Sequence, residues 1–276
     1  LRPLSYTKMQ DGYVIGSETC AFEVLGLYSH TDVLPGQAVQ FKDGIVRSFF
    51  YEENVSSNMC AMEYIYFARP DSVIENINVH NFRKETGRLL ARKDDVQADL
   101  VIGVPDSSLS AAIGYAEESG IPFETGLVKN RFVGRTFIQP TQSQRDRGVR
   151  MKLSAIEQVV SGKSVVMIDD SIVRGTTSRR IVRLLKDAGA AQVHVRIASP
   201  IITSPCFYGV DTSTKEELIG ARMNCDEICS YIEADSLKFM EIEELKAAAD
   251  GNGLCTACFD GKYCTDLFSY AKVLEA

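Results

Sequence analysis

The stretch that decides the fold reads Val165-Val-Met-Ile-Asp169-Asp170-Ser171-Ile-Val-Arg174-Gly175-Thr176-Thr177. Its first four residues are apolar, as in a strand that is buried on both faces of a parallel sheet. Two carboxylates follow at the carboxyl end of this strand, and a short loop of small and hydroxylated residues comes next. From residue 178 onward the apolar residues are spaced as on one face of a helix. The stretch therefore predicts a strand, a tight polar turn and a helix N-terminus.

This arrangement is suited to binding an anion. Unpaired backbone N–H groups and the positive end of the helix dipole face the turn, and Thr176 and Thr177 add hydroxyl donors. Asp169 and Asp170 would repel a phosphate, so they suit ribose hydroxyls or a divalent cation that accompanies phosphates. An Asp-Asp pair before a helix can also be only a cap and a solvated turn. Neither a Gly-x-Gly-x-x-Gly fingerprint nor a P-loop accompanies the pair.

Composition narrows the class of protein. At 276 residues the chain is long enough for one large domain or two small ones, and its net charge of −7 makes no case for nucleic acid or an anionic membrane. No apolar run approaches the roughly 18 residues of a membrane helix, and no signal peptide is visible. The eight cysteines are irregularly spaced, which favours metal ligation or free thiols in a reducing compartment. The sequence starts at Leu1, so we expect a processed or partial chain.

Two regions differ in pattern. The pattern of residues 1–55 predicts antiparallel strands, with a hairpin turn at Lys42-Asp43-Gly44. These strands are too few to bury a core alone. From Cys60 onward, strands alternate with helices, which predicts an α/β fold with a mostly parallel sheet covered on both faces. We expect strands at 62–68, 100–104, 123–129, 164–168 and 192–198, and helices at 79–91 and 109–119. The first of these helices has a basic face, with Arg83, Lys84 and Arg88.

Two further loops carry polar side chains. Pro105-Asp106-Ser107-Ser108 runs from a strand into a helix, either as an ordinary N-cap or as part of a ligand site at the carboxyl edge of the sheet. Residues 129–152 carry seven basic residues and one acid, Asp146. A long loop of this kind is a functional lid, a solvated loop or a nucleic-acid contact, although the last would want a broader basic surface. Because arginine grips phosphate oxygens bidentately, we favour a lid over a charged pyrophosphate.

The cysteines allow several interpretations. Cys255-Thr-Ala-Cys258 is compatible with zinc, an iron–sulfur cluster, a redox pair or chance. No second C-x-x-C stands at zinc-ribbon spacing, and the three histidines are scattered. Cys225 and Cys229 lie one helical turn apart and are interpreted as packed thiols.

Residues 165–177 closely resemble the phosphoribosyl-pyrophosphate (PRPP) signature of type I phosphoribosyltransferases. The form Asp-Asp-Ser-Ile-Val-Arg-Gly-Thr-Thr resembles that of the glutamine PRPP amidotransferase family. Arg2-Pro-Leu-Ser and Ser17-Glu-Thr-Cys-Ala-Phe-Glu are similar to the end of that family's N-terminal-nucleophile glutaminase domain. The resemblance implies that residues 1–55 are the C-terminal remnant of the glutaminase domain. It implies a type I phosphoribosyltransferase domain with a C-terminal iron–sulfur-binding tail over 56–276, without the nucleophilic cysteine and so without glutaminase activity.

The resemblance also implies roles for individual residues. PRPP would contact Asp106, Ser107, Ser108, Asp169, Asp170, Ser171, Arg174, Gly175, Thr176 and Thr177. One Mg²⁺ per subunit would lie on Ser107, Asp169 and Asp170, and the catalytic cations of the lid would be Lys129, Arg131, Arg135 and Arg147. In the iron–sulfur branch of the family, a 4Fe–4S cluster would be held by Cys60, Cys206, Cys255 and Cys258, with Cys264 considered as a substitute ligand.

The implied reaction forms 5-phosphoribosylamine and pyrophosphate from PRPP and ammonia, which derives from glutamine in the complete enzyme. Expected partners are the feedback purine nucleotides AMP, GMP and ADP and further copies of the chain in a dimer or tetramer. Neither nucleic acid nor a membrane is expected, and the location would be cytoplasmic, or plastid in a plant. The alternatives are a base phosphoribosyltransferase, for which the tail offers no base-binding hood, and a PRPP or nucleotide sensor, for which neither end offers a DNA-binding module.

Overall fold

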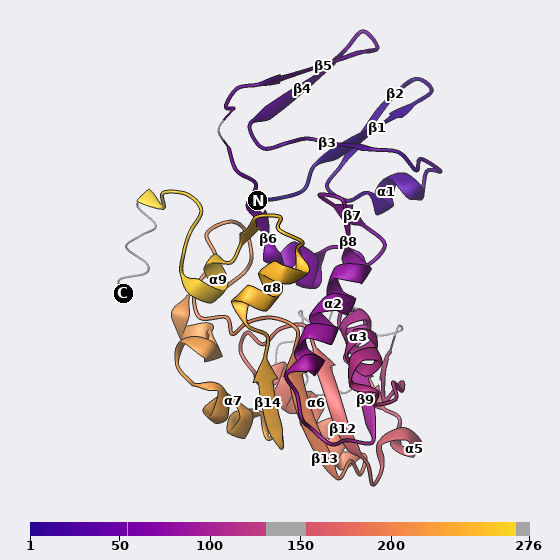
Figure 1. Cartoon of the computed structure of the whole chain (residues 1–276), viewed down its shortest axis with the longest axis vertical. Coiled ribbons are helices and arrows are strands. Elements are labelled where there is room, and N and C mark those ends of the chain that lie inside the picture. Colours follow the sequence, from indigo (N-terminus) through magenta and orange to yellow (C-terminus); the bar gives the residue numbers. More distant parts are fainter. Residues whose placement is uncertain (54, 131–152, 213, 269–276) are drawn as a thin grey trace, which may run out of the picture.

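The computed structural model describes residues 1–53, 55–130, 153–212 and 214–268 (Figure 1). Its centre is a four-stranded parallel sheet in the order β14-β13-β12-β9. These strands are β9 (Leu100–Gly103), β12 (Ser164–Asp169), β13 (Gln192–Ile197) and β14 (Ser236–Phe239). The expected α/β fold with a parallel sheet is confirmed, and the sequence analysis missed only its edge strand β14.

Strand β12 lies inside the sheet because its side chains are apolar on both faces. Residues Val165 to Ile168 are fully buried. Val166 and Ile168 pack into a cluster with the helices of one face, and Val165 and Met167 into a second cluster on the other. A strand of this kind can sit only in the middle of a covered sheet.

Helices cover both faces of the sheet (Figure 1). On one face, α2 (Val79–Arg92) packs against α3 (Leu109–Ser119), with α8 (Ile242–Ala248) beside them. Gly87 and Gly114 permit the contact, since a Cβ on either would lie 1.9 Å from a carbonyl oxygen of the opposite helix. The other face is covered by α6 (Thr176–Asp187) and α7 (Cys225–Ile232), whose apolar residues share one buried cluster.

The N-terminal region forms antiparallel hairpins that lie beyond one end of the parallel sheet (Figure 1). Its elements are β1 (Ser5–Met9), β2 (Gly12–Gly16), α1 (Cys20–Glu23), β3 (Thr31–Asp32), β4 (Gln37–Lys42) and β5 (Ile45–Phe50). The turn between β4 and β5 has positive φ at both Asp43 and Gly44, as the expected two-residue hairpin requires. In the described part of the chain one large apolar cluster begins at Met59 and the other at Leu100, so these hairpins contribute to neither.

The strand expected at 62–68 is wrong. Glu63–Phe67 is a π-helix, η1, and the strand is the short β6 (Met59–Cys60), which pairs with β15 (Leu254–Cys255). Aromatic and branched residues favour a strand locally, but the buried positions recur at helical spacing. These positions are Ala61, Met62, Tyr64, Ile65 and Ala68.

Two other expectations need correction. In 123–129, Phe123 makes only an isolated bridge to the sheet, and β10 (Leu127–Lys129) pairs antiparallel with β11 (Leu153–Ala155). Arg83 is not on a basic surface face of α2, because it is 4% exposed. The remaining short elements are β7 (Val73–Ile74), β8 (Ile77–Asn78), α5 (Glu157–Val160), η2 (Lys215–Glu217), η3 (Ile219–Ala221) and α9 (Ala257–Asp260). Within the described ranges, no helix is long and apolar enough to cross a membrane.

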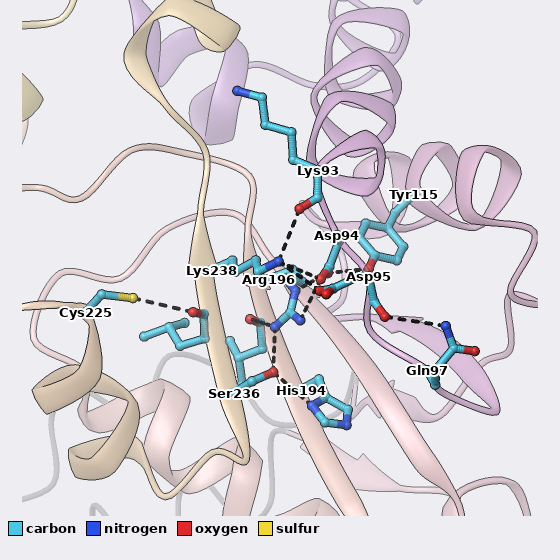
Figure 2. A network of polar contacts seen from close by, with 12 residues as sticks. Lys93, Asp94, Asp95, Gln97, Tyr115, His194, Arg196, Cys225, Ser236 and Lys238 are labelled. Atoms are coloured by element: carbon cyan, nitrogen blue, oxygen red, sulfur yellow. Dashed lines mark hydrogen bonds and ion pairs between the residues drawn. The ribbon is translucent and has the colours of Figure 1, made fainter.

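A buried ion pair joins the end of α2 to the sheet (Figure 2). The carboxylate of Asp94 accepts hydrogen bonds from Tyr115 Oη at 2.6 Å and Arg196 Nη2 at 3.0 Å, and pairs with Lys238 Nζ at 3.1 Å. The Asp94 and Arg196 side chains are 1% and 2% exposed. Burial alone would raise the pKa of Asp94, but these hydrogen bonds and the Arg196 charge hold it well below its usual range.

Replacing Asp94 by Asn is expected to lower the free energy of unfolding by about 3 kcal/mol, because it leaves Arg196 as an uncompensated buried charge. The folded-state pKa of Asp94 is depressed, so its contribution is present above an unfolded pKa of about 3.9 and is lost as pH falls below that value. Urea unfolding at pH 7 and at about pH 3 measures both effects. Asp95→Asn is the control, since that exposed carboxylate lies 3.5 Å from Lys238. Equal losses in the two variants would contradict the prediction.

Candidate active site

The acid pair lies at the carboxyl end of β12, directly before the turn into α6. Asp169 is the last residue of the strand, and α6 begins at Thr176, two residues earlier than expected. The predicted strand, turn and helix N-terminus are thereby confirmed. Thr176 and Thr177 are exposed in the first turn of the helix, where its unpaired N–H groups also lie.

A second loop meets the acid pair. It connects β9 to α3, as the sequence predicted, and Ser108 is the N-cap residue of α3. Ser108 Oγ donates to Asp169 Oδ1 at 3.1 Å, and Ser107 Oγ donates to Asp170 Oδ2. Asp106 instead points outward and pairs with Lys129 Nζ at 2.7 Å. Two loops some sixty residues apart in the chain therefore form one polar cluster.

Burial controls the electrostatics of this cluster. Asp169 and Asp170 are 7% and 9% exposed. Burial raises the pKa of Asp169 well above its ordinary value, and the neighbouring charge of Asp170 raises it further. Burial also raises the pKa of Asp170, against hydrogen bonds from Ser107 and Ser171 and the charge of Arg83. A positive charge placed beside two adjacent buried carboxylates would therefore strongly stabilise their ionised forms.

A divalent cation fits this donor set. Mg²⁺ is commonly held by one or two carboxylates, with waters and substrate phosphates completing its octahedron. The pair Asp169 and Asp170 with the Ser107 hydroxyl matches that pattern. Over the described residues, no group of three or more His, Cys, Asp or Glu side chains is arranged to hold a metal ion. A cation here would therefore depend on a ligand's oxygens for part of its coordination.

The turn itself is held from behind by a distant segment. Gly175 has φ +73°, and a Cβ at this position would lie 2.8 Å from Ile219 Cδ1 and 3.1 Å from Tyr231 Cε1. The Ile219 N–H donates to Val173 O at 2.9 Å. Arg174 pairs with Glu217 at 2.5 Å, so its guanidinium also contacts this segment.

This support was not predicted from the sequence. Ile219 and Tyr231 follow the turn by more than forty residues and belong to no recognisable motif. Glycine at 175 was the available signal, since a buried left-handed position requires it. The burial of Arg83 near the acid pair was not predicted either, because Arg83 lies in a helix whose sequence carries several basic residues.

The expected lid lies mostly outside the described residues. Lys129 is described and ends β10, directly opposite Leu153 of β11. Arg131, Arg135 and Arg147 fall in 131–152, so their expected role as lid cations stays a prediction.

The four cysteines expected to bind a cluster come from three segments that meet. Cys60 and Cys255 are paired in register on β6 and β15. The carbonyl of Cys258 accepts hydrogen bonds from the N–H groups of Thr203 and Ser204, which places this residue beside the loop that carries Cys206. The Tyr208 N–H donates to Cys206 Sγ at 3.3 Å. The fold therefore gathers the C-x-x-C with two cysteines that are remote in sequence.

These thiols influence one another. Burial raises the pKa of Cys258, and the neighbouring Cys60, Cys206 and Cys255 raise it further. Burial raises the pKa of Cys255 to about 11, with a contribution from a hydrogen bond to Cys264. The four thiols are therefore near enough to act on one another electrostatically, although in the described residues they are not arranged as a ready metal site. The other two thiols of this half, Cys225 and Cys229, donate to backbone carbonyls at 3.4 Å, as packed thiols would.

Comparison with known proteins agrees with this geometry. Residues 74–208 match the family model described as phosphoribosyl transferase domain. The matched range includes the acid pair, the turn into α6 and the loop that leads into α3, so the similarity to a phosphoribosyltransferase domain falls on the region of this site.

The wider similarity is to one kind of enzyme, amidophosphoribosyltransferase. The chain is 56% identical to that of Bacillus subtilis (strain 168), over 97% of this chain and 58% of the relative. It is 52% identical to that of Staphylococcus aureus (strain MRSA252), over 100% of this chain and 57% of the relative. A solved structure of the B. subtilis glutamine PRPP amidotransferase complexed with ADP and GMP has a TM-score of 0.90 at 55% identity, covering 98% of this chain and 60% of that one. This chain thus spans somewhat more than half the length of these relatives.

Replacing Gly175 by Ala is expected to destabilise the chain more than Gly120→Ala. Both glycines have φ near +74°, which costs an L residue about 1 kcal/mol. A Cβ at Gly120 meets nothing within 4 Å, whereas one at Gly175 meets Ile219 and Tyr231. The difference should be about 1–3 kcal/mol in urea unfolding, the usual cost of overpacking. Equal destabilisation would show that the contacts behind the turn yield freely.

Proposed function

We propose that this chain transfers a phosphoribosyl group from PRPP to ammonia. The products are 5-phosphoribosylamine and pyrophosphate, which is the first step of de novo purine synthesis. The observation that carries the proposal is the buried pair Asp169 and Asp170. This pair is hydrogen-bonded to Ser107 and Ser108 beside the N-terminus of α6, in a chain 56% identical to an amidophosphoribosyltransferase.

Each part of the site has a role in binding PRPP. The N–H groups at the start of α6, with Gly175, Thr176 and Thr177, bind the 5-phosphate. Asp169 and Asp170 hold the ribose hydroxyls. The loop Asp106, Ser107 and Ser108 receives the pyrophosphate, with Ser171 and Arg174 at the edge of the site. Bound Mg²⁺, held by Ser107 and the acid pair, would neutralise charge on the pyrophosphate.

For this reaction the chain must position the reactants and stabilise charge, and it needs no side chain that accepts a proton. The bond from ribose C1 to the pyrophosphate oxygen breaks, and its electron pair leaves with the pyrophosphate. The lone pair of ammonia attacks C1 from the opposite face, and the extra proton passes to solvent. The transition state resembles an oxocarbenium ion, so fixing the ribose and stabilising the leaving group lower the barrier. Lys129, with Arg131, Arg135 and Arg147 of the undescribed segment, supplies the cations.

The N-terminal hairpins are the basis for proposing a second domain. Since neither large apolar cluster includes a described residue before Met59, we place the boundary near residue 55 and propose that residues 1–55 are the end of a glutaminase domain. Ammonia is then the donor for the reaction of residues 56–276, and glutamine supplies it in the complete enzyme. A base phosphoribosyltransferase or a PRPP sensor is not favoured, because the relatives are amidophosphoribosyltransferases.

The proposal extends to regulation and assembly. The B. subtilis structure complexed with ADP and GMP supports feedback binding of purine nucleotides, which share a ribose 5-phosphate with PRPP. AMP would bind for the same reason. We further propose a homodimer or homotetramer and, given eight free cysteines, a cytoplasmic location.

The tail would hold a 4Fe–4S cluster. Cys60, Cys206, Cys255 and Cys258 are its proposed ligands, and the mutual influence of their thiols supports this choice. When bound, such a cluster would tie the C-terminal segment to β6 and so to the phosphoribosyltransferase domain. Cys264 contacts Cys255 and is not needed as a fifth ligand.

Replacing Asp169 or Asp170 by Asn should lower kcat/KM for PRPP by at least about 100-fold, since each change removes a preorganised charge from the site. Pyrophosphate release with ammonium and Mg²⁺ measures this, and a chelator should abolish it. Asp187→Asn is the control, because that exposed carboxylate lies at the far end of α6. Normal turnover in both acid-pair variants would refute the proposed function.

Protein purified without oxygen should contain iron and labile sulfide, about four of each per chain, with broad visible absorbance. Cys258→Ser should lose most of this iron, because it removes a buried thiolate ligand. Cys225→Ala and Cys229→Ala should keep it, since both thiols bond to backbone carbonyls instead. Bound zinc, or iron that survives Cys258→Ser, would exclude the proposed ligand set.

A further inference from the structure

A small, partly enclosed cavity lies beside Asp170 of the acid pair. It offers about 10 Å³ for the centre of a water molecule, which is room for one. Its polar lining residues are Arg83, Thr86, Ser107, Ser108 and Asp170, and Ile65 and Ala198 belong to its apolar wall. Dry cavities in proteins are apolar, whereas a site of this size with several polar partners holds a water. The cavity therefore has room for one water molecule and polar side chains in its wall to which that water could bond.

Arg83 enters this cavity from α2. It is 4% exposed, and its guanidinium is held by backbone carbonyls of the π-helix region. Nε donates to Tyr64 O at 2.7 Å, and Nη2 donates to Ala68 O at 2.8 Å. These two bonds fix the plane of the guanidinium and use two of its five N–H donors. The remaining donors are available to a group inside the cavity.

The charge of Arg83 has no direct partner. Among the described residues, none of the carboxylates lies within ion-pair distance of its guanidinium, and the charges that act on it belong to Asp170 and Glu18. A buried charge without compensation is costly, and neutral carbonyls do not compensate it. Across the cavity lies the buried carboxylate of Asp170, which carries the opposite charge. One water between them would satisfy donors and acceptors on both sides.

We propose that a single buried water links the Arg83 guanidinium to the Asp170 carboxylate, and that Arg83 is thereby a positioning residue for the acid pair. It holds Asp170 in the orientation that Ser107 and Ser171 also favour, and it supplies the positive charge behind the pair while the substrate side is open. This inference rests on the proposed function for its ligand, Mg²⁺ with PRPP. Arginine is required because a planar fork can bond two carbonyls and still aim a donor at the cavity.

The test uses Arg83→Met and Arg83→Lys, with Arg88→Met as the matched control. Arg88 lies on the same helix and pairs with Glu85 and Glu117 at the surface. Calorimetry measures the affinity for PRPP with Mg²⁺, steady-state kinetics separate KM from kcat, and urea unfolding reports stability. Arg83→Met should weaken PRPP binding by about 10- to 100-fold, as loss of an outer-shell partner does. Arg83→Lys should restore part of it, and Arg88→Met should change nothing.

A purely structural role would give a different pattern. Arg83→Met would then lower stability while the folded protein kept its affinity for PRPP, and that result would overturn the inference. Should Arg83→Met not fold, Ala198→Val fills the cavity and leaves the charge in place. It should weaken PRPP binding at normal stability, and unchanged affinity would overturn the inference equally.

A crystal structure of the unliganded wild type gives a readout that needs no substrate. It should contain one ordered water within hydrogen-bond distance of both Arg83 and Asp170, and a dry cavity would reject the inference. If the wild type fails to bind PRPP, the proposed function fails, but the water still decides this inference. If the wild type binds PRPP and Arg83→Met binds it as tightly, only the inference fails.

Discussion

The rest of the structure depends on one constraint, the placement of two adjacent carboxylates at the end of a fully buried strand. Burial raises the pKa of both carboxylates, and the neighbouring charge of Asp170 raises that of Asp169 further. Two kinds of group partly compensate the carboxylates. Ser107 and Ser108 donate hydrogen bonds to them, and the charge of Arg83 acts on Asp170. The negative charge that these groups do not compensate lies at the carboxyl end of the sheet. We propose that a cation and a sugar phosphate bind there.

The packing of helices around the sheet brings these compensating groups into place. Gly87 and Gly114 let α2 and α3 approach closely, and this approach brings Arg83 behind a loop that leads into α3. On the opposite face, Ile219 and Tyr231 fill the space beside Gly175, so the turn before α6 is supported by side chains rather than by solvent. Each contact joins segments that are distant in sequence. The turn before α6 and the loop before α3 are therefore held in place by contacts from distant segments.

A segment of the chain also connects the cysteines to the site. Cys60 ends β6, the π-helix η1 follows it directly, and the carbonyls of Tyr64 and Ala68 hold Arg83. One continuous segment thus runs from the cysteine group to the back of the acid pair. The buried pair of Asp94 and Arg196 secures the other end of α2 against β13. Helix α2 is consequently fixed at both ends by buried charges, which is uncommon for a helix that also faces solvent.

The sequence by itself determined the parallel α/β fold, both site loops and the helix that follows each, because apolar period, turn residues and acid pair are local signals. A family resemblance also predicted four cysteines as cluster ligands, which stays a prediction, and spacing alone left zinc, iron–sulfur and redox pairs open. Only the tertiary structure decided that 62–68 is helical, that Arg83 is buried, and that Ile219 and Tyr231 support Gly175. The physical reason is that burial and charge compensation are properties of contacts between distant segments, and a local pattern of residues does not encode which segments will meet.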